Sequence, residues 1–248
     1  MAHPHVSIIV PVYNEQNYIG ACLTALERQT IAPDVVYVVD NNCTDDTLRI
    51  AQTYPFVEII HESTQGICAS TKRGLDTAMI HDGIMLRCDA DCMPADDWVE
   101  KVVAHFAASD PTMSLTGPGV PYDCSRFVRA IWKWLYMKPY FVFVGAALGH
   151  APLFGSNFTL HASTWRTIKN TTHLASHQNI HDDIDLSFHL PETTRVIYDD
   201  TLSMPISARP FSSPSGMIRR FSRGFRSIFV HWPEHAPWRR YTDVNNRD

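Results

Sequence analysis

The sequence predicts an α/β fold with a mostly parallel central sheet flanked by helices. Four times in the first 111 residues, an apolar run typical of a buried strand precedes a segment with the apolar spacing of a helix. This alternation is typical of parallel strands joined by right-handed helical crossovers. The 248 residues, 45% hydrophobic and 19% charged, are enough for one packed domain with a sizeable core.

The first half of the chain supplies four strand and helix pairs. Strands are expected where β-rich apolar runs end in a proline or an acid, and helices where capping residues precede apolar residues three or four apart. Pro55 stops the second helix, and the fourth begins after Pro94 with acids in its first turn. The expected strands are 6–13, 34–40, 56–60 and 83–91, and the expected helices are 14–30, 41–55, 65–83 and 94–111.

The regular alternation fades after about Pro111. The elements expected beyond it are a strand and loop (112–123), an aromatic-rich helix (125–137), a strand with a short helix (152–168), a helix (181–190), a strand (194–202) and a basic helix from 215 to at least Gly224.

The most apolar later window, residues 136–155, is interrupted by Lys138, Pro139, His150 and Pro152. It therefore falls short of the roughly 20 apolar residues that a membrane-spanning helix needs. We expect a buried core segment, with a surface that enters the bilayer interface as the alternative.

Charge is distributed unevenly. From Pro205 onward the chain has eight arginines and three acids, whereas the preceding residues have 13 basic and 23 acidic side chains. A basic tail on an acidic body indicates contact with phosphates, of a ligand or of a membrane surface, or else a solvated arginine-rich helix.

Cysteine usage and the N-terminus indicate a cytoplasmic protein. The six cysteines form no paired C-x-x-C set, which argues against a zinc site and favours free thiols in a reducing compartment. The N-terminus has no basic start, and Pro11 interrupts its apolar stretch, so no signal peptide is expected.

Polar and acidic residues follow the predicted strands. Tyr13 and Glu15 follow the first strand, Asp40 ends the second, and Asp89 and Asp91 end the fourth. Ligands of such sheets bind beyond the carboxyl ends of the strands, so these residues are expected at one crevice. The chain has neither G-x-G-x-x-G after its first strand nor G-x-x-x-x-G-K-[ST], which argues against a dinucleotide or P-loop site.

Four stretches, "SIIVPVYNE", "VVDNNCTDDT", "LRCDADCMPADDW" and "HDDIDL", occur in this order. Together they resemble the inverting family 2 glycosyltransferases of GT-A fold, over roughly Val6 to Arg226. The resemblance implies a single GT-A domain over 1–248, with a nucleotide-sugar-binding half at about 1–110. Residues 111–248 would form a variable acceptor-binding half with a basic C-terminal tail.

The resemblance also implies the reaction. A sugar, of hexosyl type, would pass with inversion from a nucleoside diphosphate donor to a hydroxyl of a glycan or lipid-linked acceptor. UDP is the preferred nucleotide and GDP the alternative. Other interpretations are a catalytically inactive homologue that binds a nucleotide-sugar, and a nucleotidyltransferase, whose glycine-rich basic first loop the sequence lacks.

Asp89 and Asp91 predict a bound divalent cation. Two carboxylates one residue apart repel each other unless a positive charge lies near them. Mn²⁺ or Mg²⁺ takes oxygen ligands and would stabilise a departing diphosphate. Asp91 is the expected metal ligand, and the resemblance places Asp89 closer to the ribose. His231 or His235 is a candidate third ligand.

The remaining donor contacts follow from the resemblance. Tyr13 offers a flat face for a base, Pro11 directs its carbonyl at the base, and Glu15 accepts from ribose hydroxyls. Asp40 can accept from either a uracil or a guanine. Lys72 stands where the family usually has asparagine, and it could approach a phosphate. Arg73 and Arg87 are further diphosphate candidates.

Inversion requires a carboxylate that takes the proton of the attacking hydroxyl. The family places this base second in a Glu-Asp pair that opens a helix, which corresponds here to Asp182 and Asp183. Asp183 is therefore the expected general base, and Asp182 orients it or contacts the acceptor. Asp185 is expected to be structural.

The acceptor side follows from two further stretches. Gly155, Ser156 and Asn157 of "FGSNFTLHAS" would line the acceptor site. The basic residues of "RRFSRGF" would contact phosphates, namely Arg219, Arg220 and Arg223.

The class of acceptor stays open. Trp132, Trp134 and Trp165 could stack on a sugar or fill the core. The aromatic segment 127–143, together with the arginine-rich tail, could face a lipid-linked acceptor through peripheral contact with the inner face of a membrane. A soluble oligosaccharide fits equally well, and no nucleic acid partner is expected.

Overall fold

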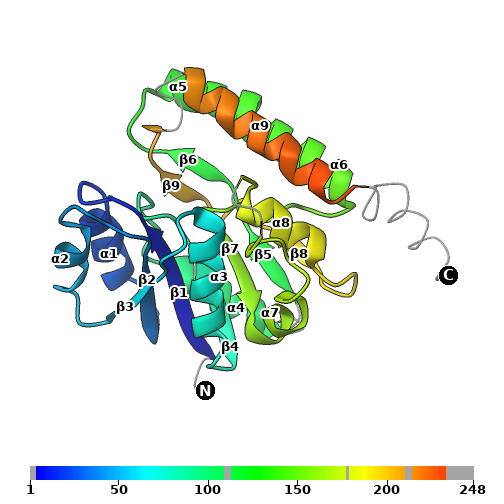
Figure 1. Cartoon of the computed structure of the whole chain (residues 1–248). Helices are drawn as coiled ribbons and strands as arrows, with labels where there is room; N and C mark the ends of the chain where they lie inside the picture. Colours follow the sequence, from blue (N-terminus) through cyan, green and yellow to red (C-terminus); the bar gives the residue numbers. More distant parts are fainter. Residues whose placement is uncertain (1–3, 109–112, 177–178, 210–213, 233–248) are drawn as a thin grey trace.

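The computed structural model describes residues 4–108, 113–176, 179–209 and 214–232 (Figure 1). A central sheet has the strand order β3-β2-β1-β4-β7-β5-β8. β1, β2, β3 and β4 are parallel, and β7 runs antiparallel between β4 and β5, so the predicted mostly parallel sheet is confirmed. The strands are β1 (His5–Val12), β2 (Val35–Asp40), β3 (Val57–His61), β4 (Gly83–Arg87), β5 (Ser114–Thr116), β7 (Phe158–His161) and β8 (Val196–Tyr198).

Helices cover both faces of the sheet because side chains of β1 alternate between them. Ile8 and Val10 pack in one core with α1 (Ile19–Glu27) and α4 (Trp98–Ala108). Ile9 packs in the other core with the helices α3 (Ile67–Ala78), α7 (Ala162–Ile168) and α8 (Asp182–His189). Strands buried on both faces explain the uninterrupted apolar runs in the sequence.

The first two helices are shorter than expected. Asn14 has a positive φ of 56°, and the backbone N–H of Glu15 donates to Thr47 Oγ1 over 2.7 Å. These contacts hold residues after β1 in a turn, so α1 begins at Ile19. Of the expected helix 41–55, only α2 (Thr47–Ala51) forms.

A second layer lies over the carboxyl ends of the parallel strands (Figure 1). One helical rod runs through Pro139, where the expected helix ended at Met137. Its turns beside this proline are π-helical, and such turns accommodate local breaks in the α-helical hydrogen-bond pattern. The rod comprises α5 (Arg126–Trp132), η1 (Lys133–Met137), η2 (Tyr140–Val144) and α6 (Gly145–Leu148).

The long helix α9 (Pro214–Val230) lies beside this rod (Figure 1). It runs through Gly224, and Phe221 meets Tyr136 of the rod edge to face, with centroids 6.2 Å apart. β6 (Gly119–Pro121) and β9 (Met204–Ile206) pair in a two-stranded sheet. In the sequence, β6 lies between β5 and α5, and β9 lies between β8 and α9. The sequence did not reveal β9.

The expectation of a buried core segment at 136–155 was partly wrong. Val144 and Leu148 are buried, but Val142 and Phe143 are 62% and 72% exposed. No helix in the described part of the chain is long and apolar enough to span a membrane.

Close packing of α3 on the sheet predicts a sensitive position at Gly74. A Cβ atom there would lie 2.4 Å from Ile9 Cγ2, and this β-branched side chain of a buried strand cannot move away easily. Gly74→Ala is therefore expected to lower the free energy of unfolding by about 1–3 kcal/mol. Gly20→Ala in α1 is the matched control, because its Cβ would meet Ile50 at 3.5 Å and gain about 0.5–1 kcal/mol. Urea unfolding checks both; equal stability of the two variants would contradict the packing described.

Candidate functional site

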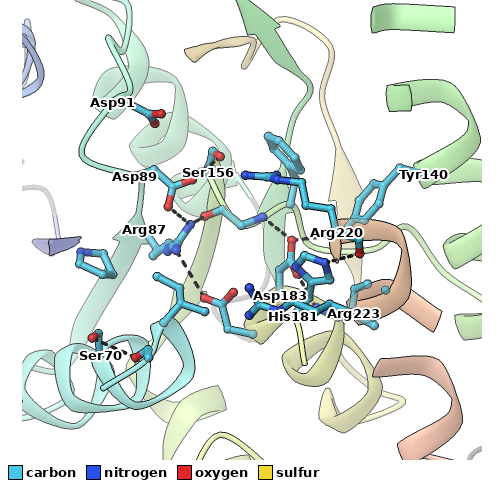
Figure 2. Close-up of a pocket in the computed structure, with 18 of the residues that line it drawn as sticks. Ser70, Arg87, Asp89, Asp91, Tyr140, Ser156, His181, Asp183, Arg220 and Arg223 are labelled. Carbon is cyan, nitrogen blue, oxygen red and sulfur yellow. Dashed lines mark hydrogen bonds and ion pairs between the residues drawn. The ribbon is translucent and has the colours of Figure 1, made fainter. Parts of the chain in front are cut away.

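A cavity of about 1080 Å³ lies between the carboxyl edge of the sheet and the second layer. Residues of the β1 and β4 ends, the first turn of α8, the η2 segment and α9 line it. Figure 2 shows Asp89, Asp91 and Asp183 around this space, with Arg220 and Arg223 entering from α9. The topology thus brings acids that follow β4 and acids that open α8 to one place.

Arg87 forms the floor of the site. It ends β4, is only 2% exposed, and pairs with Asp89 over 2.9 Å and with Asp182 over 3.5 Å. It also donates to the carbonyl of Gly155. Through these three partners Arg87 holds the acids of the cavity together, and it lines the cavity itself, so the diphosphate contact expected from the sequence stays a prediction.

Asp182 and Asp183 open α8 and are both buried. Asp182 Oδ2 accepts from Thr71 Oγ1 at 2.7 Å. Burial raises the pKa of Asp182, but the charge of Arg87 and the Thr71 hydrogen bond outweigh it, so the net pKa lies below the ordinary value. Asp182 is thus held as a carboxylate.

Asp183 has a different environment from its neighbour. Its Oδ2 accepts from the Gly155 N–H at 2.7 Å and lies 3.2 Å from Tyr140 Oη. Burial, and then the negative charge of Asp182, raise the pKa of Asp183 above its ordinary value. Asp183 is therefore the more basic of the two carboxylates, and its orientation is fixed by a backbone donor.

Arg209 supplies the positive charge next to Asp91. Its guanidinium lies 2.8 Å from Asp91 Oδ2 and 2.8 Å from Glu15 Oε2, and it covers the ring of Tyr18 at 4.1 Å. Burial and the charge of Asp89 raise the pKa of Asp91, and Arg209 acts in the opposite direction. A neighbouring positive charge thus stabilises the ionised form of Asp91, and the guanidinium of Arg209 supplies that charge here.

The acids present fit a divalent cation that prefers oxygen. Ligand atoms of Asp89, Asp91 and Cys92 lie within 4.8 Å of one another. Burial raises the pKa of the Cys92 thiol well above its ordinary value, so only the two carboxylates are suited to such an ion. Asp89 is also fixed by Ser156, whose Oγ donates to Oδ2 at 2.5 Å.

The donor-side residues divide into two groups. Pro11, Tyr13 and Glu15 line the cavity, and Tyr13 is 53% exposed. Asp40 does not line it: its carboxylate accepts from the Cys43 N–H and lies 2.9 Å from His61 Nδ1. Asn41, the next residue, lines the cavity in its place.

Lys72 and Arg73 also lie outside the cavity lining. Lys72 forms an ion pair with Asp76 one turn further along α3, so its ammonium group binds a neighbour on the same helix. Arg73 is exposed on the same helix.

On the acceptor side, Gly155, Ser156, Arg220 and Arg223 line the cavity, whereas Asn157 and Arg219 do not. The Asn157 side chain is buried, where it donates to the Leu202 carbonyl and accepts from Trp98 Nε1 at 3.0 Å. It therefore joins β7 to α4 and the chain before β9.

The tryptophans have different environments. Trp165 and Trp132 are buried in the core, while Trp134 is 59% exposed and stacks under Lys138. His231 does not line the cavity and lies 3.0 Å from Asp185, away from Asp91; His235 lies outside the described residues.

Sequence reasoning missed Arg209, Tyr140 and His181, which line the cavity. Arg209 is the first arginine of the basic C-terminal segment, and this position was its only signal. The contacts that bring it to Glu15 span 194 residues of sequence, so no local pattern marks it.

Comparisons with known proteins find similar glycosyltransferases. Relatives include glycosyltransferase AglE of Haloferax volcanii, 34% identical over 126 residues, which are 48% of this chain and 40% of that protein. A PGL/p-HBAD biosynthesis glycosyltransferase of Mycobacterium tuberculosis is 34% identical over 117 residues, 45% of each chain. This chain therefore covers less than half the length of either relative.

Solved structures share the fold. Glucosyl-3-phosphoglycerate synthase from M. tuberculosis, in complex with Mg²⁺ and UDP, has a TM-score of 0.66 at 16% identity, covering 92% of this chain and 79% of that one. Mannosyltransferase PcManGT from Pyrobaculum calidifontis, in complex with GDP-Man and Mn²⁺, has a TM-score of 0.62 at 21% identity, covering 93% and 64%. They confirm the expected GT-A fold. The sequence matches the model of glycosyl transferase family 2 over residues 7–160, and this chain belongs to that family.

Proposed function

We propose that the chain is an inverting, metal-dependent glycosyltransferase. It transfers a sugar from a nucleoside diphosphate donor, preferably of UDP and alternatively of GDP, to a hydroxyl of a glycan or lipid-linked acceptor. The supporting observation is that one cavity combines a buried, basic carboxylate at Asp183, an acidic pair at Asp89 and Asp91, and the exposed ring of Tyr13. The complexes of the fold relatives with UDP or GDP-Man are consistent with this class of donor.

The donor would lie along the carboxyl edge of the sheet. Tyr13 offers its face to the base, and Glu15 accepts from the ribose once Arg209 has left it. Arg223 can contact the diphosphate, because its side chain lines the cavity and is held there by the hydrogen bond from Nη2 to the Ile180 carbonyl. Residues 1–110 would supply most donor contacts, and residues 111–248 would supply the acceptor side together with Arg209 and Arg223.

Asp183 would act as the general base. The acceptor oxygen attacks the anomeric carbon from the face opposite the diphosphate, its proton passes to Asp183, and the bond from the anomeric carbon to the phosphate oxygen breaks. The raised pKa makes Asp183 a better proton acceptor than an exposed aspartate, and Gly155 fixes its direction. Asp182, kept ionised by Arg87, adds the negative charge that raises this pKa.

Asp91, with Asp89 beside it, would hold Mn²⁺ or Mg²⁺. When bound, this ion neutralises the charge that develops on the leaving diphosphate. The chain itself keeps the two carboxylates together. Arg87 forms an ion pair with Asp89, and the Ser156 hydroxyl orients Asp89 by a hydrogen bond.

The acceptor side favours a lipid-linked substrate at a membrane surface. Phe143, Phe221 and Phe225 line the cavity and are also 72%, 47% and 62% exposed, so the cavity opens onto an apolar surface. Further exposed apolar side chains lie on the helical rod and on α9: Phe127, Ile131, Trp134, Leu135, Ile218 and Phe229. Exposed basic residues accompany them, namely Arg126, Arg129, Lys133, Lys138, Arg219 and Arg226. This combination suits an anionic bilayer surface.

Asp183→Asn is expected to lower donor hydrolysis by about 10²–10⁴-fold, because an amide cannot take the proton of an attacking water. Nucleotide binding, measured as the rise in melting temperature with UDP and Mn²⁺, should persist. In the wild type, hydrolysis should fall as pH decreases through a pKa above the ordinary aspartate value, where Asp183 becomes protonated.

Asp82→Asn, at a 72% exposed side chain, is the control and should match the wild type. Wild-type hydrolysis rates in Asp183→Asn would contradict the assignment of the base. If no UDP- or GDP-sugar were hydrolysed by the wild type while nucleotides still bound, the chain would be an inactive binding homologue.

Arg209→Ala is expected to tighten Mn²⁺ binding in the absence of donor by about 3–10-fold, since the guanidinium that competes for Asp91 is removed. Electron paramagnetic resonance of free Mn²⁺ measures this, with Asp91→Asn as the background that lacks the site. Arg166→Ala, which removes a surface ion pair with Asp82, is the control. Unchanged or weaker Mn²⁺ binding in Arg209→Ala would refute the competition.

Binding to anionic phospholipid vesicles, measured by co-sedimentation, tests the apolar surface. Leu135→Ser combined with Ile218→Ser removes two side chains that are each 70% exposed and should weaken partitioning by about tenfold or more. Ile80→Ser is the control, because Ile80 is 75% exposed near the end of α3 and belongs to neither the helical rod nor α9. Equal binding by all variants, or no binding of the wild type, would exclude this surface as a membrane contact.

A further inference from the structure

Four metal-ligating side chains gather outside the cavity. Asp185 and His189 lie one turn apart on α8, His173 lies in the segment after α7, and His231 follows α9. One ligand atom from each lies within 4.8 Å of all the others. The side chains of Asp185 and His231 are fully buried, and that of His189 is 6% exposed. None of the four lines the cavity.

The three imidazoles lie beside Asp185 at nearly equal distances from one another. Their ring centroids are 5.0, 4.9 and 5.0 Å apart, and their planes are inclined at 66°, 74° and 64° to one another. Three imidazoles bound tetrahedrally to one zinc ion, each through a bond of about 2.0–2.1 Å, place their ring centroids about 5 Å apart. The spacing of the three rings therefore fits one shared metal ion.

Both ring nitrogens of His231 lie near oxygen acceptors, and one neutral imidazole cannot donate to both. Its Nδ1 lies 2.6 Å from the Ser227 carbonyl and its Nε2 lies 3.0 Å from Asp185 Oδ1, so both ring nitrogens face oxygen acceptors. A neutral imidazole has only one N–H, so a second proton or a metal ion is needed between His231 and Asp185. A ligating histidine whose other nitrogen donates to a backbone carbonyl is the usual arrangement around protein-bound metals.

The Asp185 side chain also makes hydrogen bonds with His173. Its Oδ1 lies 2.9 Å from His173 Nδ1, and its Oδ2 accepts from the His173 backbone N–H at 2.9 Å. His189 Nδ1 lies 2.8 Å from the backbone carbonyl of Asp185, so Nε2 is the ring nitrogen that a metal ion would take. One carboxylate and three imidazoles form the ligand set that zinc prefers over magnesium or calcium, and the spacing of Asp185 and His189 presents both on one helix face.

We propose that His173, Asp185, His189 and His231 bind one structural zinc ion. The ion joins the C-terminal end of α9 and the segment after α7 to α8. It thereby fixes the helix whose first turn carries Asp182 and Asp183 relative to the helix that carries Arg220 and Arg223. This inference stands apart from the proposed transfer reaction, since it uses none of the cavity residues.

Metal content and stability test the proposal in Asp91→Asn protein, which lacks the other candidate metal ligand. Elemental analysis of the purified protein should give about one zinc per chain. Removal of zinc with a chelator should lower the melting temperature by about 5–10 °C, and added Zn²⁺ should restore it. Co²⁺ added to the metal-free protein should give the intense visible absorption of a tetrahedral site.

His189→Gln and His231→Gln, in the same background, should lose the zinc and the chelator response, whereas His81→Gln, at an exposed histidine, should retain both. If a cluster variant fails to fold, the Co²⁺ spectrum of the parent protein still decides. Protein that contains no zinc and neither stabilises with Zn²⁺ nor gives a tetrahedral Co²⁺ spectrum would overturn the proposal. The four residues would then be a hydrogen-bonded cluster only.

Discussion

The arrangement of the site depends on the ion pairs and hydrogen bond that the buried guanidinium of Arg87 makes. It lies at the end of β4 and bonds to Asp89 in the next turn, to Asp182 on α8 and to the carbonyl of Gly155. A fully buried cation is tolerated only with such partners, and the carboxylates in turn are tolerated near each other only with the cation. One side chain therefore connects Asp89 at the end of β4 with Asp182 in the first turn of α8.

α8 connects this site to the rest of the fold through both of its ends. Its first turn carries Asp182 and Asp183 into the cavity, and its later residues meet His173 and His231 on the far side. Val144 and Leu148 of the helical rod pack against Ile184, with Ile228 of α9 beside them. The second layer is thus attached to the helix that carries Asp182 and Asp183, and the apolar surface lies next to the cavity.

Much of the fold could be predicted from local pattern. The four parallel strands and the acids at their ends were predictable because buried strands and strand-end ligands leave a signal within ten residues of sequence. The continuation of the helix through Pro139 and the pairing of β6 with β9 were not, since π-helical turns and short edge pairings depend on the tertiary contacts around them. Resemblance alone gave Asp183 its predicted role.

The site could be predicted where it follows the strands and not where distant segments meet. Arg209 reaches Glu15 from the far end of the chain, and Asp40 turns to His61 because a neighbouring strand offers a partner there. The cysteine spacing argued against a zinc site, but the candidate ligands are three histidines and one aspartate on three separate segments, which no single motif contains.

The most direct test of the account is a crystal structure of the protein with UDP and Mn²⁺, with the metal located by anomalous scattering. We expect one Mn²⁺ about 2.1–2.2 Å from a carboxylate oxygen of Asp91, with Arg209 displaced, the uracil against Tyr13 and the diphosphate in the cavity that Asp183 lines. An ion bound away from Asp91, or a nucleotide outside this cavity, would contradict the central claim that the strand-end acids and the base of α8 serve one bound molecule.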